Sequence, residues 1–162
     1  MIVLTTLGSY LLGGFCAGYY LVRLAARRDI REAGSGSAGA RNVGRLLGAP
    51  GFLGTLLLDA AKGAVAVFAA AHLVAGAWPP ALALLAVVAG HIWPLQLGLR
   101  GGKGVATAIG GTAAYLAIAA GAAPPRLAPA AAVALILPVM VLFAHRDNLA
   151  AARTRRRERA AQ

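Results

Sequence analysis

Long apolar segments alternate with short polar ones along this chain. They cover residues 2–22, 51–75, 81–99, 104–122 and 127–144. As helices, these segments match the roughly 30 Å hydrocarbon core of a bilayer. The pattern predicts an all-α fold, a polytopic transmembrane helix bundle of about five spans. Residues 1–148 would form the transmembrane domain and residues 149–162 a basic tail. Small residues dominate the apolar segments, which suits close packing between helices.

The most informative polar segment is residues 34–48, between the first two apolar segments. We interpret it as a glycine-rich loop that carries hydroxyls, an amide and two arginines. Glycine lets backbone N–H groups approach a phosphate, and Ser, Asn and Arg add side-chain donors. Residues 100–104 repeat this chemistry between the third and fourth apolar segments. Two such loops predict a site for a phosphorylated molecule. The alternative is that glycine makes flexible loops and arginine anchors helix ends at lipid headgroups.

The basic residues predict the orientation of the chain in the membrane. Lys and Arg number 16 against 5 Asp and Glu, a formal net charge of +11. Most of the basic residues lie in three segments, 23–45, 100–103 and 146–159. With five spans, these three segments fall on the same side of the membrane. On the other side, the turns between helices carry one charged residue, Arg126. By the positive-inside rule the basic side is cytoplasmic, so the N-terminus is outside and the C-terminus inside.

Two opposite charges lie inside the second apolar segment. Asp59 and Lys62 are three residues apart, so they share a helical face and can pair. Because buried charges are costly in a membrane, the pair is expected to face the bundle interior. It either fixes helix packing or has a functional role. The three histidines lie on different segments without a cysteine pair, so no metal site is expected. Cys16, the single cysteine, is expected to be a small packing residue.

Five polar motifs occur in an order that resembles one known family. The motifs are Asp29-Ile30-Arg31 with Gly34-Ser35-Gly36 and Asn42 to Arg45; Leu58-Asp59 with Lys62-Gly63; Gly90-His91 with Pro94; Gly101-Gly102-Lys103-Gly104-Val105-Ala106-Thr107; and His145-Arg146-Asp147-Asn148. They resemble the bacterial acyl-phosphate:glycerol-3-phosphate acyltransferases of the PlsY type. The resemblance implies transfer of an acyl group from acyl-phosphate to the 1-hydroxyl of glycerol 3-phosphate, which gives lysophosphatidic acid in phospholipid biosynthesis.

The resemblance also implies site residues, partners and location. The implied catalytic residues are Ser35, Lys103, His145 and Asn148. The implied substrate-binding residues are Gly34, Gly36, Asn42, Arg45, Gly101, Gly102 and Gly104. Acyl-phosphate, glycerol 3-phosphate and membrane lipid are the expected partners, with no cofactor, metal, nucleic acid or required protein partner. The expected location is the bacterial inner membrane, with the site facing the cytoplasm. Because acyl-phosphate is already a mixed anhydride, a covalent intermediate on Ser35 is not required.

The chain also departs from the family pattern. Ser37 stands where the family usually has asparagine, and Arg41, where it has threonine, is expected to place a bulky cation inside the glycine-rich loop. Between Lys103 and His145 the chain is shorter than family members, which typically have seven spans. Two alternatives follow. One is a catalytically degraded homologue that binds a phosphorylated ligand or lipid, and the other is a small transporter or structural membrane protein.

Overall fold

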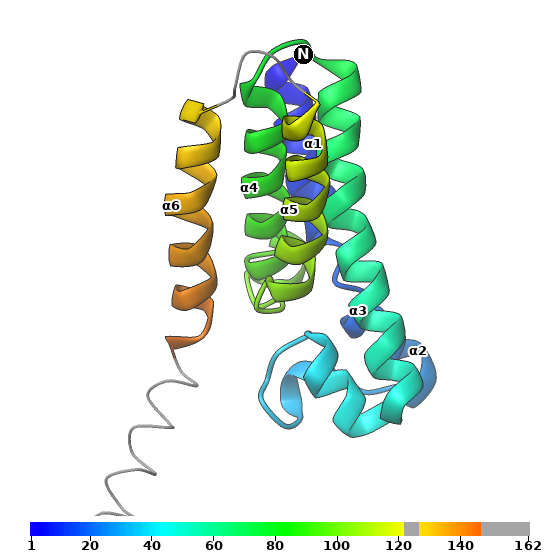
Figure 1. Ribbon diagram of the computed structural model, residues 1–162. Coiled ribbons are helices and arrows are strands. Elements are labelled where there is room, and N and C mark those ends of the chain that lie inside the picture. Colours follow the sequence, from blue (N-terminus) through cyan, green and yellow to red (C-terminus); the bar gives the residue numbers. More distant parts are fainter. Residues whose placement is uncertain (122–126, 147–162) are drawn as a thin grey trace, which may run out of the picture.

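A computed structural model describes residues 1–121 and 127–146, and the regular elements in these ranges are all helices (Figure 1). The order of elements is α1 (Ile2–Gly14), α2 (Ala17–Ala26), η1 (Ile30–Glu32), α3 (Ala40–Leu73), α4 (Trp78–Ile92), η2 (Leu95–Leu97), α5 (Val105–Ala120) and α6 (Leu127–Ala144). The two η elements are single 3-10 turns. The described residues contain no strand, and the predicted all-α class is confirmed for this part of the chain.

Three helical segments are long and apolar enough to cross a membrane: Ile2–Ala26, Ala40–Leu73 and Trp78–Leu97. The expected spans 104–122 and 127–144 coincide with α5 and α6, which are shorter apolar helices. Large apolar side chains point outward along the bundle; Leu57, Leu116 and Leu135 are at least 60% exposed. An apolar outer surface of this extent suits lipid rather than water. The number of spans and their orientation stay predictions.

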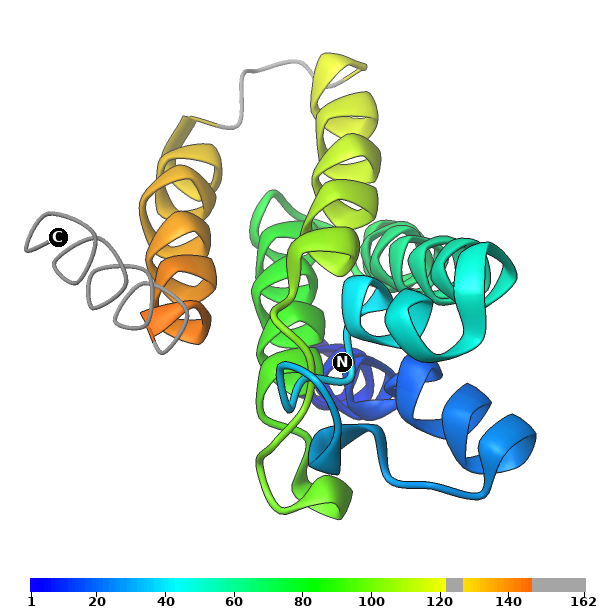
Figure 2. The ribbon, with the colours of Figure 1, turned by 90° about the horizontal axis from the view of Figure 1, so that it is seen from below.

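The first expected span, 2–22, is not one continuous helix. α1 ends at Gly14, Phe15 and Cys16 have extended backbones, and α2 then begins at Ala17 in a new direction (Figures 1 and 2). A break in an apolar helix frees carbonyl groups that need donors. Lys62 of α3 supplies them, because its Nζ donates to the carbonyls of Gly13 at 3.0 Å and Phe15 at 2.7 Å. A distant side chain therefore stabilises the break.

The expected glycine-rich loop of residues 34–48 is shorter than its composition predicts. Helix α3 already begins at Ala40, and the turns before Gly48 form a short helical piece. Gly48 has φ 69° and ψ −163°, so the helix bends there before it continues to Leu73. Pro50 follows in the first turn of the longer piece, where its missing N–H costs nothing. Asn42 and Arg45 consequently project from a helix, and the loop proper ends at Gly39.

Glycines let the helices pack backbone to backbone, as the abundance of small residues predicts. A Cβ on Gly63 of α3 would overlap the carbonyl of Thr107 in α5, and one on Gly110 would overlap the carbonyl of Ala60. The pair α1 and α4 repeats this arrangement, since a Cβ on Gly90 would overlap the carbonyl of Tyr10. Such close approach is how helices associate where lipid supplies no hydrophobic drive.

Helix α4 forms the centre of the bundle, and its residues Leu84, Val87 and Val88 are fully buried. α6 packs along α4, with the rings of Trp93 and Phe143 6.2 Å apart. The N-terminus and the α3–α4 turn lie at one end of the bundle (Figure 1). The segments before α3 and before α5, together with the last turn of α6, lie at the other. The segments that carry the basic motifs therefore share one end.

Candidate functional site

The first loop, residues 33–39, is built around the side chain of Asn42. This residue is 3% exposed, and its Nδ2 donates to the carbonyls of Ile30 at 3.2 Å, Ala33 at 2.9 Å and Ser37 at 3.0 Å. Its Oδ1 accepts a 3.0 Å hydrogen bond from the backbone N–H of Ser35. These partners engage both ends of the amide. Asn42, predicted to bind substrate, thus has a clear role in shaping the loop.

Gly34 needs to be glycine for two reasons. Its φ is +58°, and a Cβ there would overlap Asn42 Oδ1. Gly36 likewise has a positive φ of +66°. Ser35 lies exposed between the two glycines, and Arg45 Nη1 approaches from α3 to 3.6 Å from the place of a Cβ on Gly34. The loop therefore carries an exposed hydroxyl at Ser35 and has a guanidinium next to Gly34, two donor types that can bind an anion.

The second loop, residues 98–104, folds back against the end of α4. The N–H of Gly101 donates to Ile92 O at 3.1 Å, and that of Gly102 to His91 O at 3.0 Å. A Cβ on Gly101 would overlap the His91 carbonyl, and one on Gly102 would overlap His91 Nε2. The two glycines, predicted to approach substrate, are therefore also required by their packing on His91. Gly104, with φ +78°, precedes the first turn of α5.

One hydrogen bond joins the two loops, and a second joins η1 and η2, the turns that precede them. The N–H of Ala38 donates to the carbonyl of Gly101 at 3.2 Å, and Arg31 Nη1 donates to the carbonyl of Leu97 at 2.6 Å. The crossing is visible where the segments before α3 and before α5 meet at the lower end of the bundle (Figure 2). Arg31 also holds Asp29, with Nη2 2.6 Å from Oδ2. This hydrogen bond lowers the pKa of the Asp29 carboxyl and raises that of the Arg31 guanidinium.

Three of the predicted catalytic residues, Ser35, Lys103 and His145, lie at one end of the bundle. Ser35 is on the first loop and half-buried Lys103 on the second, which hydrogen bonds tie together. His145 follows α6, and its Nδ1 lies 2.8 Å from the carbonyl of Val141 in its own helix. Asn148 and the predicted basic tail lie outside the described residues.

The two departures from the family pattern have different surroundings. Ser37 is buried, and its hydroxyl accepts a 3.3 Å hydrogen bond from the N–H of Gly39, so it helps to close the loop. Arg41 is exposed on the first turn of α3. The expectation that Arg41 lies inside the glycine-rich loop is wrong, because helix α3 starts earlier than the glycine content predicts.

The predicted pairing of Asp59 and Lys62 in the bundle interior is confirmed. Asp59 is 1% and Lys62 6% exposed, and Lys62 Nζ lies 2.8 Å from Asp59 Oδ1. The ammonium also lies 2.8 Å from Nδ1 of His91 in α4. The contact between Lys62 and His91 was not predictable from the sequence, because the residues are far apart in the chain. In the sequence, both are ionisable groups within apolar segments and both belong to the motifs shared with the family, but neither feature indicates that they meet.

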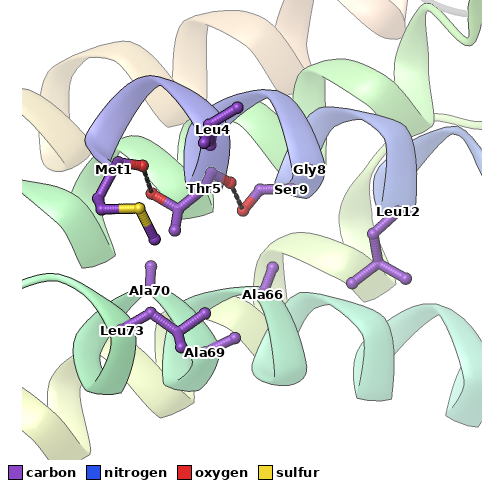
Figure 3. A pocket seen from close by; sticks show the side chains of 10 residues that line it. All are labelled: Met1, Leu4, Thr5, Gly8, Ser9, Leu12, Ala66, Ala69, Ala70 and Leu73. Atoms are coloured by element: carbon purple, nitrogen blue, oxygen red, sulfur yellow. Dashed lines mark hydrogen bonds between the residues drawn. The ribbon is translucent and has the colours of Figure 1, made fainter.

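The described residues line two hollows, both away from Asp59, Lys62 and His91. An apolar groove of about 380 Å³ lies between α1 and α3, toward the opposite end of the bundle (Figure 3). Its hydroxyl groups are turned to their own helix, since Thr5 donates to Met1 O and Ser9 to Thr5 O. A polar cleft of about 530 Å³ lies beside the first loop. Its lining comprises Tyr19, Arg23, Arg27, Arg28, Asp29, Glu32 and Ala33.

Curated relatives share much of this sequence. "Glycerol-3-phosphate acyltransferase 1" of Desulfitobacterium hafniense (strain Y51) is 59% identical over 105 residues, which cover 65% of this chain and 52% of the relative. "Glycerol-3-phosphate acyltransferase" of Shouchella clausii (strain KSM-K16) is 46% identical over 117 residues, covering 71% of this chain and 57% of the relative. The matched part thus spans little more than half the length of these relatives.

The fold is similar to a solved structure, described as the glycerol 3-phosphate form of PlsY, an integral membrane glycerol 3-phosphate acyltransferase. The TM-score is 0.79 at 26% identity, and the match covers 96% of this chain and 93% of that one. The lysophosphatidic acid form of PlsY matches with a TM-score of 0.76 at 25% identity. The family model for glycerol-3-phosphate acyltransferase matches residues 3–145. This chain, a multi-pass membrane protein, therefore belongs to the glycerol-3-phosphate acyltransferase family.

Proposed function

We propose that this chain transfers an acyl group from acyl-phosphate to the 1-hydroxyl of glycerol 3-phosphate and so produces lysophosphatidic acid. The observation that carries the proposal is the junction of the two glycine-rich loops and their preceding turns, in which Ala38 N–H donates to Gly101 O and Arg31 of η1 donates to Leu97 O of η2. Family membership and the solved PlsY forms with glycerol 3-phosphate and lysophosphatidic acid support this substrate and this product.

Phosphate binding would fall to side chains from both loops. Ser35 offers an exposed hydroxyl, and Arg45 places its guanidinium near Gly34. Lys103, the half-buried lysine of the second loop, would add a cation from the other side. Charged donors fixed around a phosphate orient the substrate and stabilise charge that develops during transfer. Gly34, Gly36, Gly101, Gly102 and Gly104 would shape the loops around it.

The chemistry needs no covalent enzyme intermediate. The 1-hydroxyl oxygen of glycerol 3-phosphate would attack the acyl carbonyl carbon, a new C–O ester bond would form, and the bond to the phosphate oxygen would break. Phosphate leaves with the electron pair of that bond, and the hydroxyl proton is lost. His145 at the end of α6 would accept this proton on a ring nitrogen, and Asn148 would complete the polar site.

The position of the loops suits substrates of opposite solubility. The loops lie at one end of a bundle whose outer surface is apolar, so an acyl chain can approach from lipid and glycerol 3-phosphate from water. We place this end at the cytoplasmic face of the inner membrane, on the strength of its arginines.

The test is acyl transfer by the purified protein in lipid or detergent, with acyl-phosphate and labelled glycerol 3-phosphate. We expect lysophosphatidic acid from the unmodified chain and a loss of at least about a hundredfold in Lys103→Ala. Arg28→Ala removes an exposed positive charge from the same end and is expected to retain activity. Folded protein without product would overturn the proposal and favour a homologue that only binds a phosphorylated ligand.

A further inference from the structure

His91 lies between a buried charged pair and the second loop. The residue is 2% exposed and occupies the last turn of α4. Lys62 Nζ lies 2.8 Å from its Nδ1. An ammonium group can only donate, so Nδ1 accepts and, in the neutral ring, the proton is assigned to Nε2. One side of the imidazole is therefore held by α3.

The other side of the imidazole faces the second loop. Nε2 occupies the space that a Cβ on Gly102 would need, so the ring packs directly on that glycine. The carbonyl of His91 also accepts the N–H of Gly102 at 3.0 Å, and it occupies the space that a Cβ on Gly101 would need. Ring and backbone of His91 thus contact the two residues that precede Lys103.

Lys62 is itself firmly placed. Its ammonium lies 2.8 Å from Asp59 Oδ1 and donates to the carbonyls of Gly13 and Phe15 at the α1–α2 break. Burying an ammonium group costs solvation free energy, and these contacts offset that cost, so Lys62 would be destabilised if it moved away from them. The imidazole of His91 is therefore hydrogen-bonded to an ammonium that is itself held by Asp59 and by the carbonyls at the end of α1.

We propose that His91 is a positioning residue for the phosphate site. Lys62 holds its ring, and His91 in turn holds Gly101 and Gly102 so that Lys103 is presented to glycerol 3-phosphate. The inference rests on the function proposed above. Because His91 acts through the loop and does not touch the substrate, its loss should weaken substrate binding more than it slows the chemical step.

The experiment compares His91→Leu with His91→Asn in the purified full chain. Both variants lose the ring contact with Gly102, but asparagine keeps an acceptor for Lys62 near the place of Nδ1 and leucine does not. His72→Asn is the matched control, because His72 is exposed at the far end of α3. The readouts are KM for glycerol 3-phosphate, kcat, and hydrogen exchange of the amides in residues 98–104 without substrate.

We expect His91→Leu to raise KM about tenfold with kcat within about threefold of the unmodified chain, and His91→Asn to show a smaller rise. Exchange at Gly101 and Gly102 should accelerate in His91→Leu and stay unchanged in His72→Asn. Unchanged KM and exchange in folded His91→Leu would overturn the inference, as would equal defects in the leucine and asparagine variants.

Two further outcomes separate the proposals. If His91→Leu does not fold, the comparison of His91→Asn with His72→Asn tests the positioning role. Faster hydrogen exchange at Gly101 and Gly102 in His91→Asn supports that role, and unchanged exchange refutes it. Should the unmodified chain show no acyl transfer, the proposed function fails. The exchange comparison then still decides whether His91 orders the loop, because it requires neither substrate nor turnover.

Discussion

Arg31 Nη1 donates a 2.6 Å hydrogen bond to the carbonyl of Leu97, while Nε and Nη2 of the same guanidinium bind Asp29. The planar guanidinium of one arginine thus ties η1, the turn before the first loop, to η2, the turn before the second. The guanidinium carbon of Arg31 also lies 5.1 Å from the centroid of the Tyr19 ring, so α2 contacts the same junction.

Arg31→Ala should separate the two loops. We expect activity to fall about tenfold or more and the free energy of unfolding to fall by about 1–3 kcal/mol, because a charge-assisted hydrogen bond and the partner of Asp29 are lost. Arg28→Ala, an exposed arginine of the same end, serves as the control. Acyl transfer and thermal unfolding in detergent measure the two effects. Normal activity in Arg31→Ala would show that the junction does not matter for turnover.

The ionisation of Asp29 should make the stability of the folded chain depend on pH. Arg31 lowers the pKa of this carboxyl in the folded chain, so the stabilisation is fully present above its unfolded pKa of about 4. It is lost as the pH falls through the lower pKa that Asp29 has in the folded chain, because the carboxyl is then protonated in the folded state as well as in the unfolded one. The difference in thermal midpoint between the unmodified chain and Asp29→Asn should therefore be largest near neutral pH and shrink on acidification. A constant difference would contradict this coupling.

Asn42→Ala should disorder the first loop. Three carbonyls and one N–H lose their partner, and buried unsatisfied groups cost about 1–3 kcal/mol. We expect a lower thermal midpoint and a loss of activity that extra substrate does not restore. Gln96→Ala is the control, since this amide is exposed and donates one hydrogen bond to Gly14 O. Equal effects of the two variants would argue against a special role for Asn42.

Gly110→Ala should force α3 and α5 apart. Its new Cβ would overlap the carbonyl of Ala60, and overpacking of this kind costs about 1–3 kcal/mol. Gly8→Ala in α1 is the matched control, because no atom lies within 4 Å of the place of its Cβ. Thermal unfolding should show a clear loss for Gly110→Ala and none for Gly8→Ala. A well-tolerated alanine at Gly110 would mean that the helices can move apart at little cost.

Local pattern was enough to predict several features of this protein. The runs 104–122 and 127–144 correspond to α5 and α6, because uninterrupted apolar sequence favours helix over most of its length. The spacing of Asp59 and Lys62 predicted their pairing, since residues three apart share a helical face. The order of the polar motifs identified the family, which the family model confirms. Composition predicted a loop up to Gly48, but α3 already begins at Ala40. A glycine-rich segment can still form a helix where the residues between its glycines pack against the rest of the fold.

The tertiary structure decided what depends on partners distant in the chain. The break between α1 and α2 exists because Lys62, on another helix, donates to the carbonyls of Gly13 and Phe15. Arg31 belongs to the first polar motif, but the sequence did not indicate that it would join η1 to η2 through the carbonyl of Leu97. Sequence by itself determined helices, charge distribution and family, because these follow from neighbouring residues. Which groups meet was decided only by the close packing of helices, since most buried polar groups need a hydrogen-bond partner and take it wherever the fold provides one.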